Sequence, residues 1–163
     1  MKILYFGGQK SGKSRLAEEK TLSLAECKPY YIASYDSSYS DDEMNLRIAK
    51  HKEQREDRFI TLEERYDLPK VIEENQTYII DCMSMWLLNN INKSEEILIK
   101  QIDGLANKDA NIVFVLNDVN SGVIPLGHET RKFVDLTGII GQKLASICDE
   151  VYAVKLGLPL KLK

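Results

Sequence analysis

The chain has 163 residues, of which 44% are hydrophobic and 29% charged, and its formal net charge is −3. These values are ordinary for a soluble globular protein, and the length suits one domain with its own core, so we predict a single domain over residues 1–163. A net negative charge argues against a protein that binds nucleic acid over much of its surface. No apolar run approaches the roughly 20 residues that span a bilayer, so we expect no membrane segment.

The three cysteines, Cys27, Cys82 and Cys148, lie far apart and are odd in number. Their spacing indicates neither a disulfide framework nor a metal-binding pair, which fits a reducing compartment. The stretch before the first glycines is too short for a signal peptide. We therefore predict a cytoplasmic protein whose partners are small molecules.

Short apolar runs alternate with helical patterns along the chain, and no repeat or linker divides it. Continuous apolar runs are typical of strands covered on both faces, and their alternation with helices predicts an α/β fold with a largely parallel sheet and flanking helices. In chain order, the predicted strands are 2–6, 29–33, 58–62, 77–80, 112–116 and 151–155. The predicted helices are 13–24, 41–53, 67–74, 84–91, 95–106 and 129–148. The tail at 157–163 is predicted to form a terminal hairpin with the last strand.

The first predicted strand leads into a glycine-rich loop with the pattern G-x-x-x-x-G-K-S. Glycines let backbone N–H groups approach phosphate oxygens, and the following helix presents its positive end to the same anion. We predict that Lys13 is a catalytic residue that contacts the β- and γ-phosphates, and that Ser14 holds Mg²⁺ through its hydroxyl. The predicted nucleotide-binding residues of the loop are Gly7, Gly8, Gln9, Lys10, Ser11, Gly12, Lys13 and Ser14.

A second candidate residue follows the predicted strand at 77–80. The glycine-rich loop has the pattern of a P-loop, the phosphate-binding loop of many nucleotide-binding proteins. Such a site needs an acid at the end of a neighbouring strand to position Mg²⁺, and Asp81 stands in such a place. Asp81 is therefore predicted to bind both nucleotide and metal, although acids also end strands for purely structural reasons. Switch GTPases are the rival class, but their guanine-reading N-K-x-D is absent, and the D-x-x-G match at 135–138 lies inside a predicted helix.

These motifs resemble those of the bifunctional adenosylcobinamide kinase/adenosylcobinamide-phosphate guanylyltransferase family of cobalamin biosynthesis. The likeness covers nearly the whole chain, and the run D-D-E-M…R-I-x-x-H-K is its most specific part. The segments that carry the likeness are G-G-x-x-S-G-K-S-R at 7–15, Y-I-A-S at 31–34, D-D-E-M at 41–44, R-I at 47–48, H-K at 51–52, D-V at 118–119 and I-P at 124–125.

The resemblance implies a RecA-like strand order and two activities that need Mg²⁺. In the first, ATP or GTP phosphorylates the aminopropanol hydroxyl of adenosylcobinamide. In the second, a histidine takes GMP from GTP and passes it to the cobinamide phosphate, which gives adenosylcobinamide-GDP. The histidine that matches this role is His51. The resemblance also implies a homo-oligomer, specifically a trimer.

The surroundings of His51 in the sequence agree with this role. On a helix, His51 and Arg47 share a face, and Lys52 adds a further positive charge. Cations disfavour protonation of an imidazole, so a nitrogen lone pair stays available to attack an α-phosphorus. A single histidine in a charged helix is otherwise most often a surface residue, and it is the resemblance that favours catalysis.

Three further residues are candidate nucleotide ligands on the basis of the resemblance. Ser34 matches a residue that lines the nucleotide site, Lys52 adjoins the histidine, and Glu63 matches an acid placed to contact the ribose or base. Glu63 fits equally well as half of an acidic surface pair with Glu64. Two other functions remain open, namely a P-loop kinase of another small alcohol without a covalent step, and a nucleotide-binding regulator that serves a partner.

Overall fold

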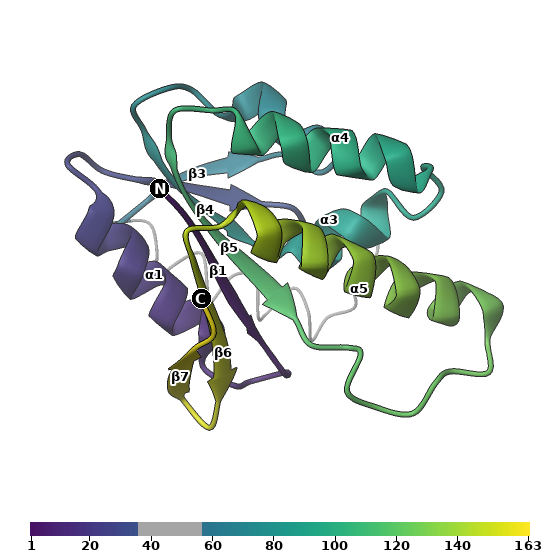
Figure 1. The fold of residues 1–163 in the computed structure, drawn as a ribbon. Helices are drawn as coiled ribbons and strands as arrows, with labels where there is room; N and C mark the ends of the chain where they lie inside the picture. The colour runs from purple at the N-terminus through teal and green to yellow at the C-terminus, as the bar shows by residue number, and fades with distance from the viewer. Residues whose placement is uncertain (36–56) are drawn as a thin grey trace.

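A computed structural model describes residues 1–35 and 57–163 of the chain (Figure 1). The strands are β1 (Lys2–Gly7), β2 (Tyr30–Ala33), β3 (Ile60–Glu63), β4 (Thr77–Asp81), β5 (Asn111–Asn117), β6 (Glu150–Lys155) and β7 (Leu158–Lys161). The helices are α1 (Lys13–Leu24), α3 (Met83–Asn89), α4 (Glu95–Ala106) and α5 (His128–Ile147), and η2 (Leu68–Val71) is a 3₁₀ turn. The described residues form one seven-stranded sheet in the order β3-β2-β4-β5-β1-β6-β7, parallel except for β7. The predicted α/β fold with a largely parallel sheet and flanking helices is confirmed.

Helices cover both faces of the sheet, with α1 on one face and α3, α4 and α5 together on the other (Figure 1). Side chains alternate between two hydrophobic layers, because successive residues of a strand point to opposite faces. In β1, Ile3 and Tyr5 join the layer under α1, whereas Leu4 joins the layer under the other helices. The central strands are therefore buried on both sides, which explains their continuous apolar sequence.

The RecA-like strand order that the resemblance implies is also confirmed. β1 pairs in parallel with β5 on one side and with β6 on the other, and β4 lies beyond β5. β5 is thus inserted between the strand that leads into the glycine-rich loop and the strand that ends in Asp81. Since these strands run in one direction, their carboxyl ends share one edge of the sheet, where ligands of open α/β sheets bind.

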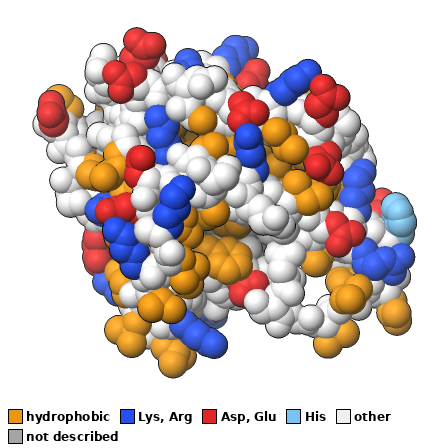
Figure 2. All heavy atoms as spheres, in the orientation of Figure 1, with side chains coloured by type: hydrophobic (Ala, Val, Ile, Leu, Met, Phe, Trp, Pro, Cys, Tyr) orange, Lys and Arg blue, Asp and Glu red, His pale blue; other side chains and the backbone are white. Residues whose placement is uncertain are grey.

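The predicted terminal hairpin is present, because β7 pairs antiparallel with β6. Its turn contains Gly157 in the left-handed region, at φ +80°. Leucines at the turn and along β7 face solvent, and Leu156 is 91% exposed. Figure 2 shows hydrophobic side chains gathered over this hairpin and again over the loop that precedes α5.

One predicted element is wrong in type, since the segment at 67–74 forms only the short 3₁₀ turn η2. The turn ends at Val71, and Ile72 adopts an extended backbone with its side chain buried in the core. The N–H of Glu73 donates to the hydroxyl of Tyr78 at 3.0 Å, so it is not used in a helical hydrogen bond. A tertiary partner on β4 therefore replaces the helical ladder that the local pattern favoured.

The remaining predicted strands and helices within the described residues are present, with ends shifted by a few positions. The predicted helix at 41–53 lies outside the described residues. Across 1–35 and 57–163, no helix combines the length and the apolar character needed to cross a membrane.

Phe114 tests the layered core, because it lies in the central strand β5 and is fully buried under α3, α4 and α5. We expect Phe114→Ala to lower the free energy of unfolding by about 3–5 kcal/mol, since a large cavity replaces the ring. The control Leu158→Ala removes a side chain that is 71% exposed and should change stability by less than about 0.5 kcal/mol. Urea unfolding followed by the fluorescence of the single tryptophan, the buried Trp86, measures both. Equal effects of the two variants would contradict the assigned core.

Candidate functional site

The glycine-rich loop connects the carboxyl end of β1 to the start of α1 and takes its shape from two left-handed residues. Lys10 has φ 55° and Gly12 has φ 95°, and Gly12 is the N-cap of α1. Between them, the N–H of Ser11 donates to the carbonyl of Gly8 at 3.2 Å. The loop thus turns tightly and places the amino end of α1 at the edge of the sheet, an arrangement suited to bind an anion.

The terminal hairpin holds this loop from the outside. The N–H of Gly157 donates to the carbonyl of Ser11 at 2.8 Å, and a Cβ on Gly12 would lie 3.2 Å from the Cα of Gly157. A Cβ on Gly7 would lie only 2.5 Å from the carbonyl oxygen of Val154 in β6. Close backbone packing therefore excludes a side chain at Gly7, and the left-handed backbone at φ 95° together with a tight contact disfavours one at Gly12.

Lys13 begins α1 and is buried, with its ammonium donating to the carbonyl of Gly8 at 3.1 Å. Burial lowers the pKa of Lys13 below its usual value, while the nearby Asp81 and Cys82 oppose this shift. A buried cation with one carbonyl partner is strongly stabilised by an added anion. Lys13 is thus held where a phosphate group at the amino end of α1 would meet it.

Asp81 is the last residue of β4, and its position corrects one expectation. β4 is not the direct neighbour of β1, because β5 lies between the two strands. The carboxylate nevertheless interacts electrostatically with Lys13. The hydroxyl of Tyr31 in β2 donates to Oδ2 of Asp81 at 2.7 Å. The structure therefore brings Lys13 and Asp81 together across the intervening strand.

Ser34 follows β2 directly and is buried. Its hydroxyl donates to the carbonyl of Cys82 at 2.9 Å, and its own carbonyl accepts a hydrogen bond of 2.6 Å from the side chain of Asn89 in α3. The residue thus ties the ends of β2 and β4 together. Ser34 therefore lies at the same edge of the sheet as Asp81, and its hydroxyl is hydrogen-bonded to the backbone.

Cys82 is the cysteine nearest to this edge, and it is poorly suited to act as a nucleophile. Burial raises the pKa of the Cys82 thiol to about 12, and the charge of Asp81 adds to the effect. At neutral pH the side chain is therefore a thiol, and it is the thiolate that reacts. Covalent chemistry at this site, where it occurs, needs another residue.

Glu63 ends β3 at the opposite margin of the sheet, four strands from β1. At the usual strand spacing this is about 19 Å from the glycine-rich loop. Its side chain is 70% exposed, with Arg65 at 3.9 Å. Its neighbour Glu64 instead accepts backbone hydrogen bonds from Tyr66 at 2.8 Å and Asp67 at 2.9 Å, so the two acids of this pair have different partners.

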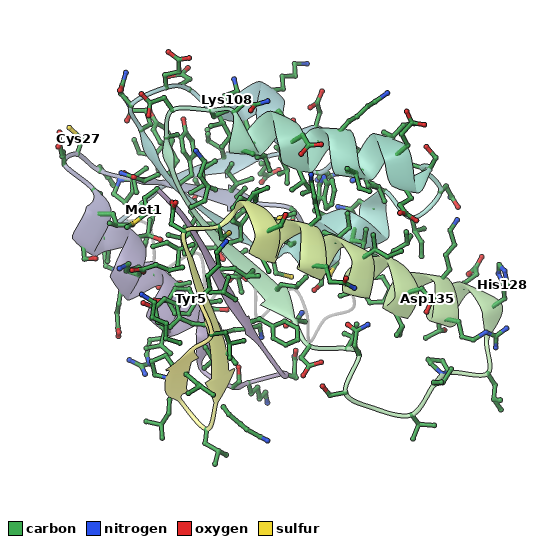
Figure 3. The ribbon with its side chains drawn as sticks, in the orientation of Figure 1. Met1, Tyr5, Cys27, Lys108, His128 and Asp135 are labelled. Atoms are coloured by element: carbon green, nitrogen blue, oxygen red, sulfur yellow. The ribbon has the colours of Figure 1, made fainter. Side chains whose placement is uncertain are left out.

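The predicted catalytic His51 and its neighbour Lys52 lie outside the described residues. The other histidine, His128, is exposed at the first position of α5 (Figure 3). Asp135, which belongs to the D-x-x-G match, lies within the same helix, as its sequence pattern indicated. The D-x-x-G match at 135–138 is therefore part of a helix, not a loop that contacts the γ-phosphate of a nucleotide.

Sequence reasoning missed two residues of the site. Asn117 ends β5, and in the sheet it pairs with Gly7, so it lies between the glycine-rich loop and the end of β4. Tyr31 lies inside an apolar strand, yet its hydroxyl reaches Asp81. Asp81 was singled out because it is a polar residue at the end of a buried strand, and Asn117 could have been recognised by the same rule. Tyr31 had no such signal, because the sequence does not reveal which strands are neighbours.

The donor set at this edge fits Mg²⁺ bound together with a nucleotide. Mg²⁺ in such sites uses one or two protein oxygens and takes its other ligands from phosphates and water. Ser14 in the first turn of α1 and Asp81 supply a hydroxyl and a carboxylate of this kind. In the described parts of the chain, no three His, Cys, Asp or Glu side chains gather into a site that would hold a metal alone. The Oγ of Ser11 is buried without a hydrogen-bond partner among the described residues, which also fits a loop that receives a ligand.

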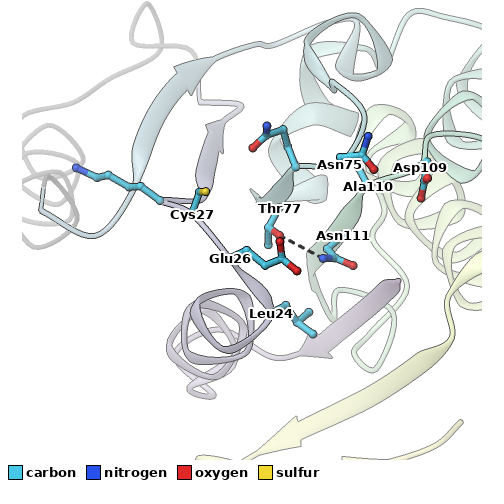
Figure 4. A pocket seen from close by; sticks show the side chains of 10 residues that line it. Leu24, Glu26, Cys27, Asn75, Thr77, Asp109, Ala110 and Asn111 are labelled. Atoms are coloured by element: carbon cyan, nitrogen blue, oxygen red, sulfur yellow. Dashed lines mark hydrogen bonds between the residues drawn. The ribbon is translucent and has the colours of Figure 1, made fainter.

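A polar cavity of about 260 Å³ lies at the opposite end of the sheet (Figure 4). It is lined by residues from the segment after α1 and from the amino ends of β4 and β5, among them Cys27, Thr77 and Asn111. A hydrogen bond of 3.3 Å joins the side chains of Asn111 and Thr77. The cavity is remote from the glycine-rich loop and is not part of the candidate site.

A glycine-rich loop between a central parallel strand and a helix, with a lysine and an acid at one sheet edge, defines the class of P-loop nucleotide-binding proteins. The chain matches, over residues 3–162, the family described as cobinamide kinase / cobinamide phosphate guanyltransferase, and it belongs to that family. The resemblance recognised from the motifs is thus confirmed.

Two curated relatives are similar to the chain over its whole length. The bifunctional adenosylcobalamin biosynthesis protein CobP of Pseudomonas aeruginosa is 34% identical over 179 residues, which covers 100% of this chain and 98% of the relative. The bifunctional adenosylcobalamin biosynthesis protein CobU of Escherichia coli is 30% identical over 185 residues and is covered, like this chain, to 100%. Among solved structures, the KaiC-like protein PH0186 of Pyrococcus horikoshii matches with a TM-score of 0.49 and 13% identity, covering 93% of this chain and 69% of that one. A likeness at that level assigns no function.

The two adjacent glycines of the loop provide a matched pair of variants. We expect Gly7→Ala to destabilise the fold by about 1–3 kcal/mol, because the new Cβ would overlap the carbonyl oxygen of Val154. Gly8→Ala should stay within about 0.5 kcal/mol of the parent protein, since no described residue other than its own neighbours in the chain comes within 4 Å of its Cβ position. Thermal unfolding of the two variants without nucleotide measures the difference, and a Gly7→Ala protein as stable as Gly8→Ala would refute the close contact with β6.

Proposed function

We propose that this chain phosphorylates adenosylcobinamide with ATP or GTP and then transfers GMP from GTP to the resulting adenosylcobinamide phosphate. The single observation that supports this most strongly is membership of the cobinamide kinase / cobinamide phosphate guanyltransferase family over residues 3–162. The P-loop geometry agrees with it, because Lys13 and Asp81 interact at the edge where a triphosphate would bind.

In the kinase step, the hydroxyl oxygen of the substrate's aminopropanol group attacks the γ-phosphorus. The bond from that phosphorus to the bridging β-oxygen breaks, a nucleoside diphosphate leaves, and the hydroxyl proton passes to solvent. Lys13 exchanges its hydrogen bond to Gly8 for phosphate oxygens and stabilises the charge that develops there. The amino end of α1 and the backbone N–H groups of the loop hold the same phosphates in line.

In the second step, an imidazole nitrogen of His51 attacks the α-phosphorus of GTP, and pyrophosphate leaves. An oxygen of the cobinamide phosphate then attacks the same phosphorus, the P–N bond breaks, and adenosylcobinamide-GDP is released. The support for His51 is its position in the D-D-E-M…R-I-x-x-H-K run of the sequence. The raised pKa of Cys82 argues against this cysteine as the acceptor of GMP.

The remaining assignments are also proposals. Mg²⁺, bound by the triphosphate together with Ser14 and Asp81, would neutralise phosphate charge. Ser34 and Lys52 are proposed to line the nucleotide site. Glu63 lies at the far margin of the sheet, so we assign it to the ribose or base rather than to the phosphates. We further propose that the chain acts in the cytoplasm as a homo-oligomer, a trimer by analogy with the family.

Lys13 tests the kinase step. We expect Lys13→Met to slow phosphate transfer to cobinamide at least about 100-fold, because a preorganised donor to the transferring phosphate is lost. The control Lys100→Met alters an exposed lysine on α4 that pairs with Glu96, and it should leave the rate unchanged. Transfer of labelled phosphate from ATP to cobinamide is the measurement. If the parent protein transfers no phosphate to cobinamide but phosphorylates another alcohol, cobinamide is not its substrate and the proposed function is wrong.

His51 tests the guanylyl transfer. After incubation with GTP and Mg²⁺, mass spectrometry should find one GMP added to the parent protein and to His128→Ala, and none added to His51→Ala. The adduct should be labile in acid, as expected of a phosphoramidate. A parent protein that stays unmodified would indicate a plain kinase, and an adduct that survives in His51→Ala would move the covalent step to another residue.

A further inference from the structure

The polar contact of Tyr31 with Asp81 links β2 to the candidate metal site. Tyr31 is 2% exposed and lies in the hydrophobic layer under α1. In the sheet, Tyr31 stands beside Ile79, and Ala33 stands beside Asp81. Because side chains repeat every two residues, Tyr31 and Asp81 point to the same face, and the phenol spans the offset to donate to Oδ2 at 2.7 Å.

The position of this hydroxyl is set by packing. The ring of Tyr31 meets the ring of Phe59 edge-on, with centroids 5.9 Å apart and planes at 78°. Both side chains are 2% exposed, so the tyrosine has little freedom to move away from Asp81. A rigid donor on one carboxylate oxygen selects one rotamer of the aspartate and leaves the second oxygen to other partners.

Packing alone does not explain a tyrosine at this position. A phenylalanine would fill the same space in the layer under α1 without the cost of burying a hydroxyl. The hydroxyl of Tyr31 donates a hydrogen bond of 2.7 Å to the side chain of Asp81. Asp81 lies at the same edge of the sheet as Lys13 and interacts with it electrostatically. The distance is that of a well-formed O–H···O hydrogen bond, and a carboxylate acceptor strengthens such a bond.

We propose that Tyr31 is a positioning residue for the nucleotide-bound divalent cation, acting through Asp81. The proposal rests on the proposed role of Asp81 in holding Mg²⁺. Tyr31 itself touches neither metal nor phosphate. Its hydroxyl holds Oδ2 on the face of the sheet that α1 covers, and leaves the second oxygen of Asp81 to the cation.

The test is Tyr31→Phe in the full chain, with Tyr5→Phe as the matched control. Tyr5 is a second buried tyrosine of the same layer, but it stacks on Tyr152 instead of contacting Asp81. The first readout is the binding of a fluorescent, non-hydrolysable triphosphate analogue across a Mg²⁺ titration. We expect Tyr31→Phe to raise the half-saturating Mg²⁺ concentration about 10- to 100-fold, as for other residues that orient a metal ligand. Binding of the analogue without Mg²⁺ should not change, and Tyr5→Phe should match the parent protein throughout.

A second readout is phosphate transfer to cobinamide. In Tyr31→Phe the rate at saturating Mg²⁺ should approach that of the parent protein, whereas at low Mg²⁺ it should fall in parallel with binding. A merely structural role would lower the rate equally at all Mg²⁺ concentrations, and that result would overturn the proposal. An unchanged Mg²⁺ dependence of binding in Tyr31→Phe would overturn it as well.

The variant Asp81→Asn and the parent protein separate this proposal from the proposed function. Asp81→Asn should raise the Mg²⁺ requirement at least as much as Tyr31→Phe, and an unchanged requirement would overturn the role of both residues. Absence of phosphate transfer by the parent protein would count against the proposed function, while the binding titration would still decide the role of Tyr31.

If Tyr31→Phe does not fold, Phe59→Leu loosens the ring but keeps the hydroxyl, and it should shift the Mg²⁺ dependence in the same direction by a smaller factor. No shift in that variant would contradict the proposal.

Discussion

The parallel pairing of β1 between β5 and β6 is the interaction on which the rest of the site depends. It aims the glycine-rich loop outward from the centre of the sheet and brings β6 so close that Gly7 has no room for a side chain beside Val154. The same pairing carries the terminal hairpin to the loop, where Gly157 donates to Ser11. These backbone contacts hold the loop in one shape, which reduces the entropic cost of binding an anion.

The second consequence of this strand order is electrostatic. Lys13 is buried at the start of α1, and burial of a cation is unfavourable unless negative groups lie nearby. The charge of Asp81, two strands away, acts on Lys13, and Asp81 in turn accepts a hydrogen bond from the hydroxyl of Tyr31. The site therefore links charges and a hydrogen bond from β2 through β4 to the start of α1, across four neighbouring strands of the sheet. In the proposed function, a nucleotide with its cation binds at this point.

Much of this arrangement was predictable, because its signals are local. The loop follows from glycine and lysine spacing, and the strands follow from apolar runs that are covered on both faces. Local signals failed where a distant partner intervened. At Glu73 the Tyr78 hydroxyl ends the helical pattern, and at Asp81 the insertion of β5 overturns the expected adjacency to β1. Tyr31 was read only as part of a motif, since its partner lies fifty residues away along the chain.

The sequence by itself determined the class of protein, the loop that binds phosphate and the family, because each is written in residues close together along the chain. It also singled out His51, whose proposed role follows from the resemblance to that family. Only the tertiary structure decided which residues share the site. It joined Tyr31 and Asp81, placed Asn117 beside Gly7, and set Glu63 at the far margin. The physical reason is that strand order is chosen by packing over the whole sheet, and a strand's own residues do not encode its neighbour.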